Sequence, residues 1–419
     1  MRIGDRAKRQ RGSKWHTLVL VPGTALPGVA AFAAMALIGR SAGFDVVGLI
    51  SLSRVAAAFG AAMLANGPAM AALRSIASGE NRLPAFRGAV VRKMGRLLPA
   101  MALLAGVVWW FDSDLGQPLL AAVPLLVVET MYTFEADVFR YEHRFARSST
   151  FSSVRAVVGW GAAVAAALLG AGFVGVIAAF IIASAIVGLI FRWPRLAPTD
   201  AQTADELRRT WGSISMLNVA GYVLNNGDQY LIGAIAGPAA VGIYSLGYQL
   251  GGGSVGAVGE PIAGALGPRV LHEWHDRARG QTQARSTARR AGLAILFSGA
   301  LISFAVWLAG GLGLLDRLAH DHDFAFVATM IALASAVHIG SSVAWSTLLF
   351  AEDRARDISA CSWATVAVAA VLVPALTIKF GVRGAAVATL LAYAFLAVLL
   401  GWRARHAREA ISPTPVAAE

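Results

Sequence analysis

The sequence predicts an all-α protein that crosses a membrane about twelve times, with its helices in two parallel six-helix lobes. Composition, the length of the apolar runs and an internal repeat predict this fold. The 419-residue chain is 57% hydrophobic and 14% charged, with a mean hydropathy of +0.62, whereas soluble domains carry about 25% charged residues. Apolar stretches of about 20 residues, the length that a spanning helix needs, recur along nearly the whole chain. The chain is therefore an integral membrane protein.

The apolar stretches predict twelve spans in order along the chain. They are residues 17–38, 46–69, 95–111, 118–138, 151–171, 173–191, 212–236, 241–266, 291–314, 324–350, 358–378 and 382–402. The runs are continuous rather than alternating and about twice as long as a barrel strand, which excludes a transmembrane β-barrel. The first span is too long for the apolar region of a secretory signal, so we expect a retained helix.

Basic residues indicate how the helices are oriented. Of the 36 Lys and Arg residues, five lie in outer loops or within a span, namely Arg40, Arg54, Arg317, Lys379 and Arg383. The others, with Arg155 counted among them, fall in the termini and in alternate loops, which we assign to the cytoplasm. Topology thus explains the net charge of +12, and we expect no nucleic-acid partner. The outer loops are too short to hold an enzyme's chemistry.

An internal repeat divides the chain into two halves. Residues 37–52 (LIGRSAGFDVVGLISL) and 231–246 (LIGAIAGPAAVGIYSL) are identical at nine of sixteen positions, with an offset of 194 and no gap. Because each half holds six spans, the halves run in the same direction and a pseudo-twofold axis lies along the membrane normal, as in secondary transporters. The predicted organisation is a cytoplasmic basic N-terminus (1–16), lobe 1 (17–192), a cytoplasmic inter-lobe loop (193–211), lobe 2 (212–403) and a cytoplasmic tail (404–419).

The repeat regions also carry a family resemblance. The stretch LIGRSAGFDVVGLISLSRVAAAFGAAMLANGPAMAALRSIASGE and the later NNGDQYLIGAIAGPAAVGIYSLGYQL resemble the polysaccharide flippases of the MOP superfamily, of the O-antigen and exopolysaccharide (Wzx or PST) type. The matching features are Arg40 to Gly43, Gly48, Arg74, Asp228 and the segment from Val241 to Ser245. The resemblance implies movement of a polyprenyl-diphosphate-linked oligosaccharide from the inner to the outer leaflet by alternating access.

Ionisable residues inside spans are costly and usually face the bundle interior or a wet cavity. Six such residues are Arg54, Glu129, Glu135, Asp137, Asp228 and Glu260. Glu135 and Asp137 are expected at the inner membrane interface, near Arg140 and Arg144. Arg54 lies on a face of its span made mostly of small side chains, which suits close helix packing or a cavity wall with room for a head group. The N–H groups of its guanidinium could then bind a diphosphate. The structural alternative is an ion pair of Arg54 with Glu129 or Glu260.

Further residues complete the expected substrate site. Arg74 and Arg269 occupy nearly equivalent places at the inner ends of spans two and eight. They could capture an anionic head group, or only fix the topology. The full predicted substrate-binding set is Arg54, Arg74, Glu129, Tyr244, Gln249, Glu260 and Arg269.

A polar cluster in the seventh span has no counterpart in lobe 1, where Asp228 corresponds to Ala34. The resemblance implies that an acidic residue here couples transport to a cation, H⁺ or Na⁺, and we assign Asn225, Asn226 and Gln229 to the same site. A structural ion pair and a sugar contact are the alternatives for Asp228.

The sequence therefore predicts a lipid-linked oligosaccharide flippase of a bacterial inner membrane, without a resident cofactor or metal. Membrane lipids, a polysaccharide polymerase and glycosyltransferases are its expected partners. The alternative function is a multidrug or organic-cation antiporter of the MATE type, which would share the twelve-helix parallel repeat.

Overall fold

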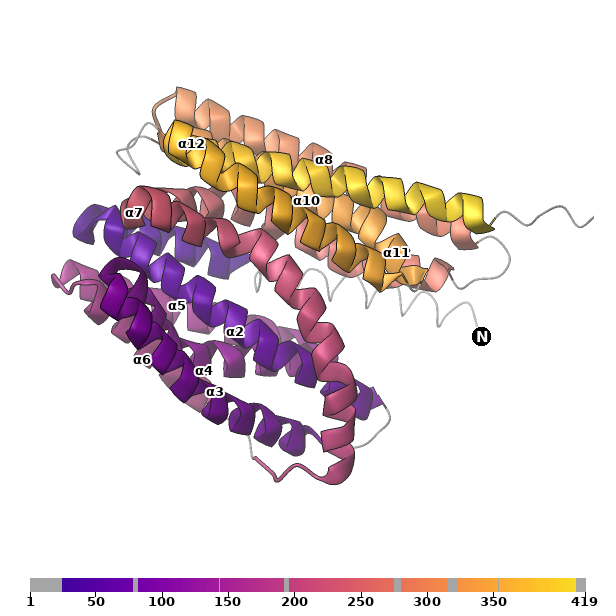
Figure 1. Cartoon of the computed structure of the whole chain (residues 1–419), viewed down its shortest axis with the longest axis horizontal. Coiled ribbons are helices and arrows are strands. Elements are labelled where there is room, and N and C mark those ends of the chain that lie inside the picture. Colours follow the sequence, from indigo (N-terminus) through magenta and orange to yellow (C-terminus); the bar gives the residue numbers. More distant parts are fainter. Residues whose placement is uncertain are drawn as a thin grey trace, which may run out of the picture.

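The computed structural model describes residues 25–77, 82–142, 144–191, 196–274, 280–315, 323–352 and 354–411, and the regular structure in these ranges is helical (Figure 1). The predicted N-terminus, 1–16, lies outside the described residues. The helices are Ala25–Ala42, α2 (Phe44–Ala77), α3 (Leu83–Phe111), α4 (Ser113–Tyr141), α5 (Phe145–Leu168), α6 (Phe173–Ile190), α7 (Ala201–Trp274), α8 (Gly280–Gly311), α10 (Asp323–Ser341), the π-helix η1 (Ser342–Ser346), α11 (Thr347–Ala351) and α12 (Ala355–Ile411).

Ten ranges within the described residues are long and apolar enough to cross a membrane. Two of them contain a helix break at a glycine with positive φ, Gly237 in α7 and Gly381 in α12. In α7 the chain reverses there, because Gln229 and Ser245 are hydrogen-bonded although they lie sixteen residues apart. Thus α7 holds the seventh and eighth predicted spans and α12 the last two, which accounts for the twelve spans predicted from the sequence.

Local sequence explains where several helices begin. The Asp112 carboxylate accepts hydrogen bonds from the backbone N–H groups of Asp114 and Leu115 and so caps the start of α4. Asp200 caps α7 in the same way, and the hydrogen bonds from Thr203 hold the pKa of the Asp200 carboxyl below its usual value. The range predicted as the inter-lobe loop, 193–211, is therefore helical from Ala201 onward.

The repeat is reproduced in atomic detail where the two lobes meet. Gly43 and its equivalent Gly237 both have positive φ. A Cβ on Gly48 would lie 1.8 Å from the Pro238 carbonyl oxygen, and a Cβ on the equivalent Gly242 would lie 2.0 Å from that of Phe44. Reciprocal contacts of this kind are what a twofold axis produces. The two glycines therefore allow the lobes to meet backbone to backbone at the predicted outer end.

The first segment of α7 runs beside α2 and links the two lobes (Figure 1). Near its start, Trp211 packs against a lobe 1 cluster and donates a hydrogen bond from Nε1 to the Met63 carbonyl, at 2.8 Å. Farther along, the Tyr222 and Tyr230 hydroxyls donate to backbone carbonyls of α2, at 2.9 and 2.8 Å. This segment thus follows α2 across most of the predicted membrane thickness.

Candidate functional site

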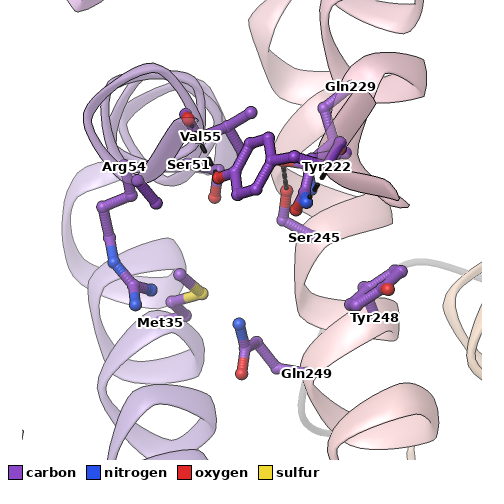
Figure 2. A pocket seen from close by; sticks show the side chains of 11 residues that line it. Met35, Ser51, Arg54, Val55, Tyr222, Gln229, Ser245, Tyr248 and Gln249 are labelled. Atoms are coloured by element: carbon purple, nitrogen blue, oxygen red, sulfur yellow. Dashed lines mark hydrogen bonds between the residues drawn. The ribbon is translucent and has the colours of Figure 1, made fainter. Parts of the chain in front are cut away.

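A cavity of about 180 Å³ lies between the lobes, lined by α2 and by Met35 of the first helix on one side, and by both segments of α7 on the other (Figure 2). Four pairs of lining residues are related by the repeat offset of 194, so the cavity lies on the pseudo-twofold axis. The pairs are Met35 and Gln229, Ser51 and Ser245, Arg54 and Tyr248, and Val55 and Gln249. Of the predicted site residues, Arg54, Asn226, Gln229 and Gln249 are brought together here.

Arg54 projects from α2 into this cavity (Figure 2). Its Nε atom is buried without a hydrogen-bond partner, and the guanidinium lies 4.9 Å from the centre of the Trp160 ring. Neither predicted ion-pair partner bonds to it: Glu129 pairs with another arginine, and Glu260 is exposed. A cation–π contact contributes about 0.5–2 kcal/mol, whereas burying an ion costs several kcal/mol. Arg54 is therefore half-buried with its charge at the cavity wall, where an anionic ligand could compensate it.

Arg155 of lobe 1 is buried, and its placement corrects the expectation that it lies in an inner loop. It pairs with Glu129 of α4, and its guanidinium lies 4.0 Å from the centre of the Tyr132 ring. The helix α5 begins at Phe145, six residues before the predicted span. The polar residues at its start hid this part of the helix from the hydropathy pattern, yet they are satisfied inside the bundle: the Ser148 hydroxyl, for example, donates to the Ala136 carbonyl at 3.1 Å. Lobe 1 thus holds the buried Arg155, the cavity-lining Arg54 and one carboxylate, Glu129, at its centre.

Substituting Glu129 by Gln is expected to destabilise the protein by about 3–5 kcal/mol, because Arg155 would then be buried without its counter-ion. The measurement is the free energy of unfolding in detergent, followed by tryptophan fluorescence. The control is Glu142→Gln at the end of the same helix, where the pair with Arg144 is 3.4 Å long and partly exposed, so we expect less than about 1 kcal/mol. Equal effects of the two substitutions would contradict this assignment.

Asp228 is the centre of a buried hydrogen-bond network in lobe 2. Its side chain accepts hydrogen bonds from the Tyr244 hydroxyl, from Thr389 Oγ1 at 3.1 Å and from the Gln229 backbone N–H at 2.9 Å. Asp228 also lines a second cavity of about 240 Å³ between α7 and α12. Thr389 was not found from the sequence, because a single threonine in an apolar span gives no signal until the fold places it beside a carboxylate.

The other predicted polar residues of α7 have different environments. Asn225 accepts a hydrogen bond at 2.8 Å from the Tyr393 hydroxyl of α12. Asn226 donates one at 3.3 Å to the Tyr222 carbonyl and lines the cavity between the lobes. Tyr244 is fully buried and bonded to Asp228, so it does not line that cavity. The predicted cluster is therefore divided between two cavities.

Several predicted residues lie away from both cavities. Arg269 is exposed and pairs with Glu273 at 2.7 Å, and Glu260 is exposed on the same helix. Arg74 lies on α2, but its side chain is outside the described residues. Glu135 forms two 2.7 Å hydrogen bonds with Arg87, and Asp137 lies 3.2 Å from Arg140. These last two pairs agree with the structural interpretation of both carboxylates.

Comparison with known proteins agrees with this architecture. Residues 99–296 match the model of a family described as polysaccharide biosynthesis protein. No sequence among the curated proteins matches the chain. Among solved structures, the MurJ lipid II flippase in an inward closed conformation has a TM-score of 0.69 and 12% identity, with 91% of this chain and 86% of that chain covered.

Two MATE transporters have similar folds. One is an inward-facing multidrug resistance transporter of the MOP superfamily, with a TM-score of 0.59, 15% identity and 96% of each chain covered. The other is a mutant from Vibrio cholerae, with a TM-score of 0.58, 14% identity and coverage of 96% of this chain and 97% of that chain. This chain is therefore a multi-pass membrane protein with the fold shared by MATE transporters and the MurJ flippase, and its central region matches the polysaccharide biosynthesis family model.

Proposed function

We propose that this protein moves a polyprenyl-diphosphate-linked oligosaccharide across a bacterial inner membrane by alternating access. The observation that carries the proposal is Arg54, an arginine on the lobe 1 wall of the axial cavity whose Nε is buried without a hydrogen-bond partner. The nearby Arg155 adds a second positive charge against the single Glu129. A diphosphate compensates this excess charge, and guanidinium groups bind phosphate oxygens through two parallel hydrogen bonds.

The lobe 2 wall of the same cavity supports a sugar contact. It presents the amide and hydroxyl groups of Gln229, Ser245, Tyr248 and Gln249, which are uncharged donors and acceptors. Such groups fix the orientation of a polar ligand by hydrogen bonding. The diphosphate is therefore assigned to lobe 1 and the first sugar to lobe 2. A polysaccharide polymerase and glycosyltransferases acting on the same lipid carrier are the proposed partners.

The structure also contains a feature that favours the second candidate, an organic-cation antiporter. The cavity between α7 and α12 is mostly apolar and has one carboxylate, Asp228, in its wall. An apolar site with one acidic group suits a small organic cation. However, Asp228 already accepts hydrogen bonds from Tyr244 and Thr389, and Arg54 disfavours a cation in the axial cavity. The flippase is therefore the better-supported function.

Flipping is tested with purified protein in liposomes that contain an NBD-labelled polyprenyl diphosphate linked to one sugar. Dithionite added outside bleaches only the outer leaflet, so we expect the protein to make the inner-leaflet probe accessible. Ethidium efflux from the same liposomes tests the antiporter. Transport of ethidium without movement of the labelled lipid would contradict the proposed function and support the alternative.

We assign the coupling ion as a proton that binds Asp228. The part of α12 before its break at Gly381 lines this cavity with Val366, Ala369, Ala370 and Val373, which offer no side-chain oxygen to a sodium ion. The part after the break adds the hydroxyls of Thr389 and Tyr393, which are already bonded to Asp228 and Asn225. Two hydroxyls and one backbone N–H already donate to the carboxylate. A proton needs no further ligands, so it fits this environment better than a metal cation.

Asp228→Asn is expected to remove the acceleration of flipping by an imposed pH gradient and to preserve gradient-independent exchange, since an amide cannot release a proton. Flipping of the NBD-labelled lipid is measured with and without a gradient of one pH unit. The control is Asp205→Asn on the exposed start of α7, which should respond like the unmodified protein. Acceleration of the unmodified protein by a sodium gradient instead would overturn the proton assignment.

A further inference from the structure

A small pocket lies at the predicted cytoplasmic end of lobe 2, where residues of α8, η1, α11 and the end of α12 come together. Arg285 and Arg289 of α8 and Arg405 of α12 line it, together with Trp345 of η1 and the carboxylate of Glu352. These side chains carry three positive charges and one negative charge, and the excess of positive charge favours an anionic ligand. The pocket shares no residue with either of the two cavities described above.

Glu352 directly follows α11, and one of its carboxylate oxygens has no hydrogen-bond donor. Its side chain is only 6% exposed, and Oε1 lies 3.6 Å from a guanidinium nitrogen of Arg285. Oε2 is buried and accepts no hydrogen bond within the described structure, because the nearest guanidinium nitrogen of Arg354 is 3.8 Å away. Leaving a buried oxygen without a donor is costly, so Oε2 indicates a donor group that a ligand brings into the pocket.

The equivalent carboxylate of lobe 1 has a different environment. The loops after the fourth span of each lobe have the same backbone hydrogen bond, donated by the amide of Arg144 in lobe 1 and of Arg354 in lobe 2, with an offset of 210. Glu142 therefore corresponds to Glu352, but its side chain is 28% exposed, so water can satisfy it. The loop itself does not require a buried glutamate. The burial of Glu352 comes from the lobe 2 residues around this pocket.

The other two arginines of the pocket are available to a ligand. Arg289 and Arg405 are exposed and form no ion pair with a carboxylate among the described residues. The Arg289 guanidinium lies 5.4 Å from the centre of the Trp345 ring. Tryptophan is enriched at the level of the lipid headgroups, and arginine binds phosphate oxygens through paired hydrogen bonds. The mouth of the pocket therefore matches the phosphate of an inner-leaflet lipid.

The size of the pocket determines which part of a headgroup can enter it. Its volume of about 10 Å³ is close to the smallest space that holds a water molecule, so it admits one small polar group but no phosphate. An ammonium group there would lie near the Arg285 guanidinium, which repels it. A hydroxyl group is an uncharged donor and meets no such repulsion, so a hydroxyl matches Glu352 Oε2.

We propose that this pocket binds a phospholipid of the phosphatidylglycerol class from the inner leaflet. The phosphate bonds to Arg289 and Arg405 at the mouth, and a headgroup hydroxyl donates a hydrogen bond to Glu352 Oε2. The bound lipid joins α8 to the end of α12. This site goes beyond the proposed function, since its ligand is a membrane lipid that is bound and not transported.

The test titrates the purified full-length protein in detergent with lipids of identical acyl chains and counts bound molecules by native mass spectrometry. Phosphatidylglycerol is compared with phosphatidylmethanol, which has the same charge but no hydroxyl, and with phosphatidylethanolamine, which has an ammonium group. We expect phosphatidylglycerol to bind about tenfold more tightly than phosphatidylmethanol, because the methyl group leaves Oε2 without a donor. Phosphatidylethanolamine should also bind more weakly than phosphatidylglycerol.

Two sets of variants assign the binding to this pocket. Arg289→Gln and Arg405→Gln should each lower the affinity for phosphatidylglycerol about fivefold. Arg290→Gln is their control, because Arg290 is exposed on the same helix but does not line the pocket. Glu352→Ala should remove the preference for phosphatidylglycerol over phosphatidylmethanol, whereas the equivalent substitution in lobe 1, Glu142→Ala, should preserve it.

Each contrary outcome overturns a defined part of the inference. Equal affinity of the unmodified protein for phosphatidylglycerol and phosphatidylmethanol would exclude the hydroxyl contact with Glu352, and this comparison decides even if Glu352→Ala does not fold. An effect of Arg290→Gln as large as that of Arg289→Gln would show diffuse attraction to a basic surface instead of a site. Competition by soluble glycerophosphoglycerol would exclude a membrane lipid as the required ligand. These measurements contain no polyprenyl substrate, so their failure is distinguishable from failure of the proposed flippase function.

Discussion

Arg54→Gln is expected to reduce flipping of the labelled lipid by at least about 30-fold, because removal of one partner from a buried charge pair costs about 2 kcal/mol or more. The same substitution should leave the protein as stable as before or more stable, since it removes a buried guanidinium whose Nε has no partner. Flipping is measured in the liposome assay and stability by thermal unfolding in detergent. Loss of function together with a gain in stability is the signature of a binding residue.

The matched control for Arg54 is Arg147→Gln. Arg147 also packs on an aromatic ring at 4.9 Å, that of Phe139, but it is exposed on α5 and does not line the axial cavity. We expect this variant to flip lipid at the rate of the unmodified protein. If Arg54→Gln retained full activity, or if it lost activity because it unfolded, the assignment of Arg54 to the diphosphate would be wrong.

Gly48→Val and Gly242→Val are each expected to stop transport by preventing the lobes from closing at the predicted outer end. The first side-chain carbon would overlap a backbone carbonyl, at 1.8 Å from Pro238 O or 2.0 Å from Phe44 O. Backbone atoms cannot rotate away as a side chain can, so we expect a penalty of several kcal/mol against this conformation. Since each 1.4 kcal/mol changes a population tenfold, the equilibrium should shift to conformations that are open at this end.

The shift is measured as the distance between spin labels at positions 40 and 234, two exposed residues related by the repeat. Both valine variants should lengthen this distance by a similar amount, because their contacts are reciprocal. Gly253→Val is the control, since a Cβ at Gly253 meets no atom within 4 Å. An unchanged distance in either variant, with the protein folded, would show that the glycine contact does not close this end.

The parts of the fold that depend on local composition could be predicted from the sequence. Hydropathy located the spans, since an apolar run of sufficient length has few other stable environments. The offset of 194 identified equivalent residues of the two lobes, and the matched pair Gly48 and Gly242 then lie against each other in the structure. Arg54 and Asp228 were also found, because placing a charged side chain within a membrane span costs free energy and therefore indicates a binding or structural role.

The rest of the site depends on residues that are unremarkable until folding brings them together. Arg155 lies in a serine-rich helix start that resembles a loop, so its burial beside Glu129 could not be anticipated. Thr389 and Tyr393 lie far along the chain from Asp228 and Asn225, yet bond to them. The alternative considered for Arg54, an ion pair with Glu129, is not formed, because Arg155 pairs with that carboxylate instead.

The first segment of α7 has hydrogen bonds both to lobe 1 and to the rest of lobe 2. Within the described residues, Trp211, Tyr222 and Tyr230 bond it to lobe 1. Side chains of Asn225, Asp228 and Gln229 bond it to lobe 2, with Tyr393, Tyr244, Thr389 and Ser245 as the donors. A hydrogen bond contributes about 1 kcal/mol. Under the proposed proton coupling, we expect gain or loss of one proton at Asp228 to change only the bonds on the lobe 2 side, and so to shift which lobe this segment moves with.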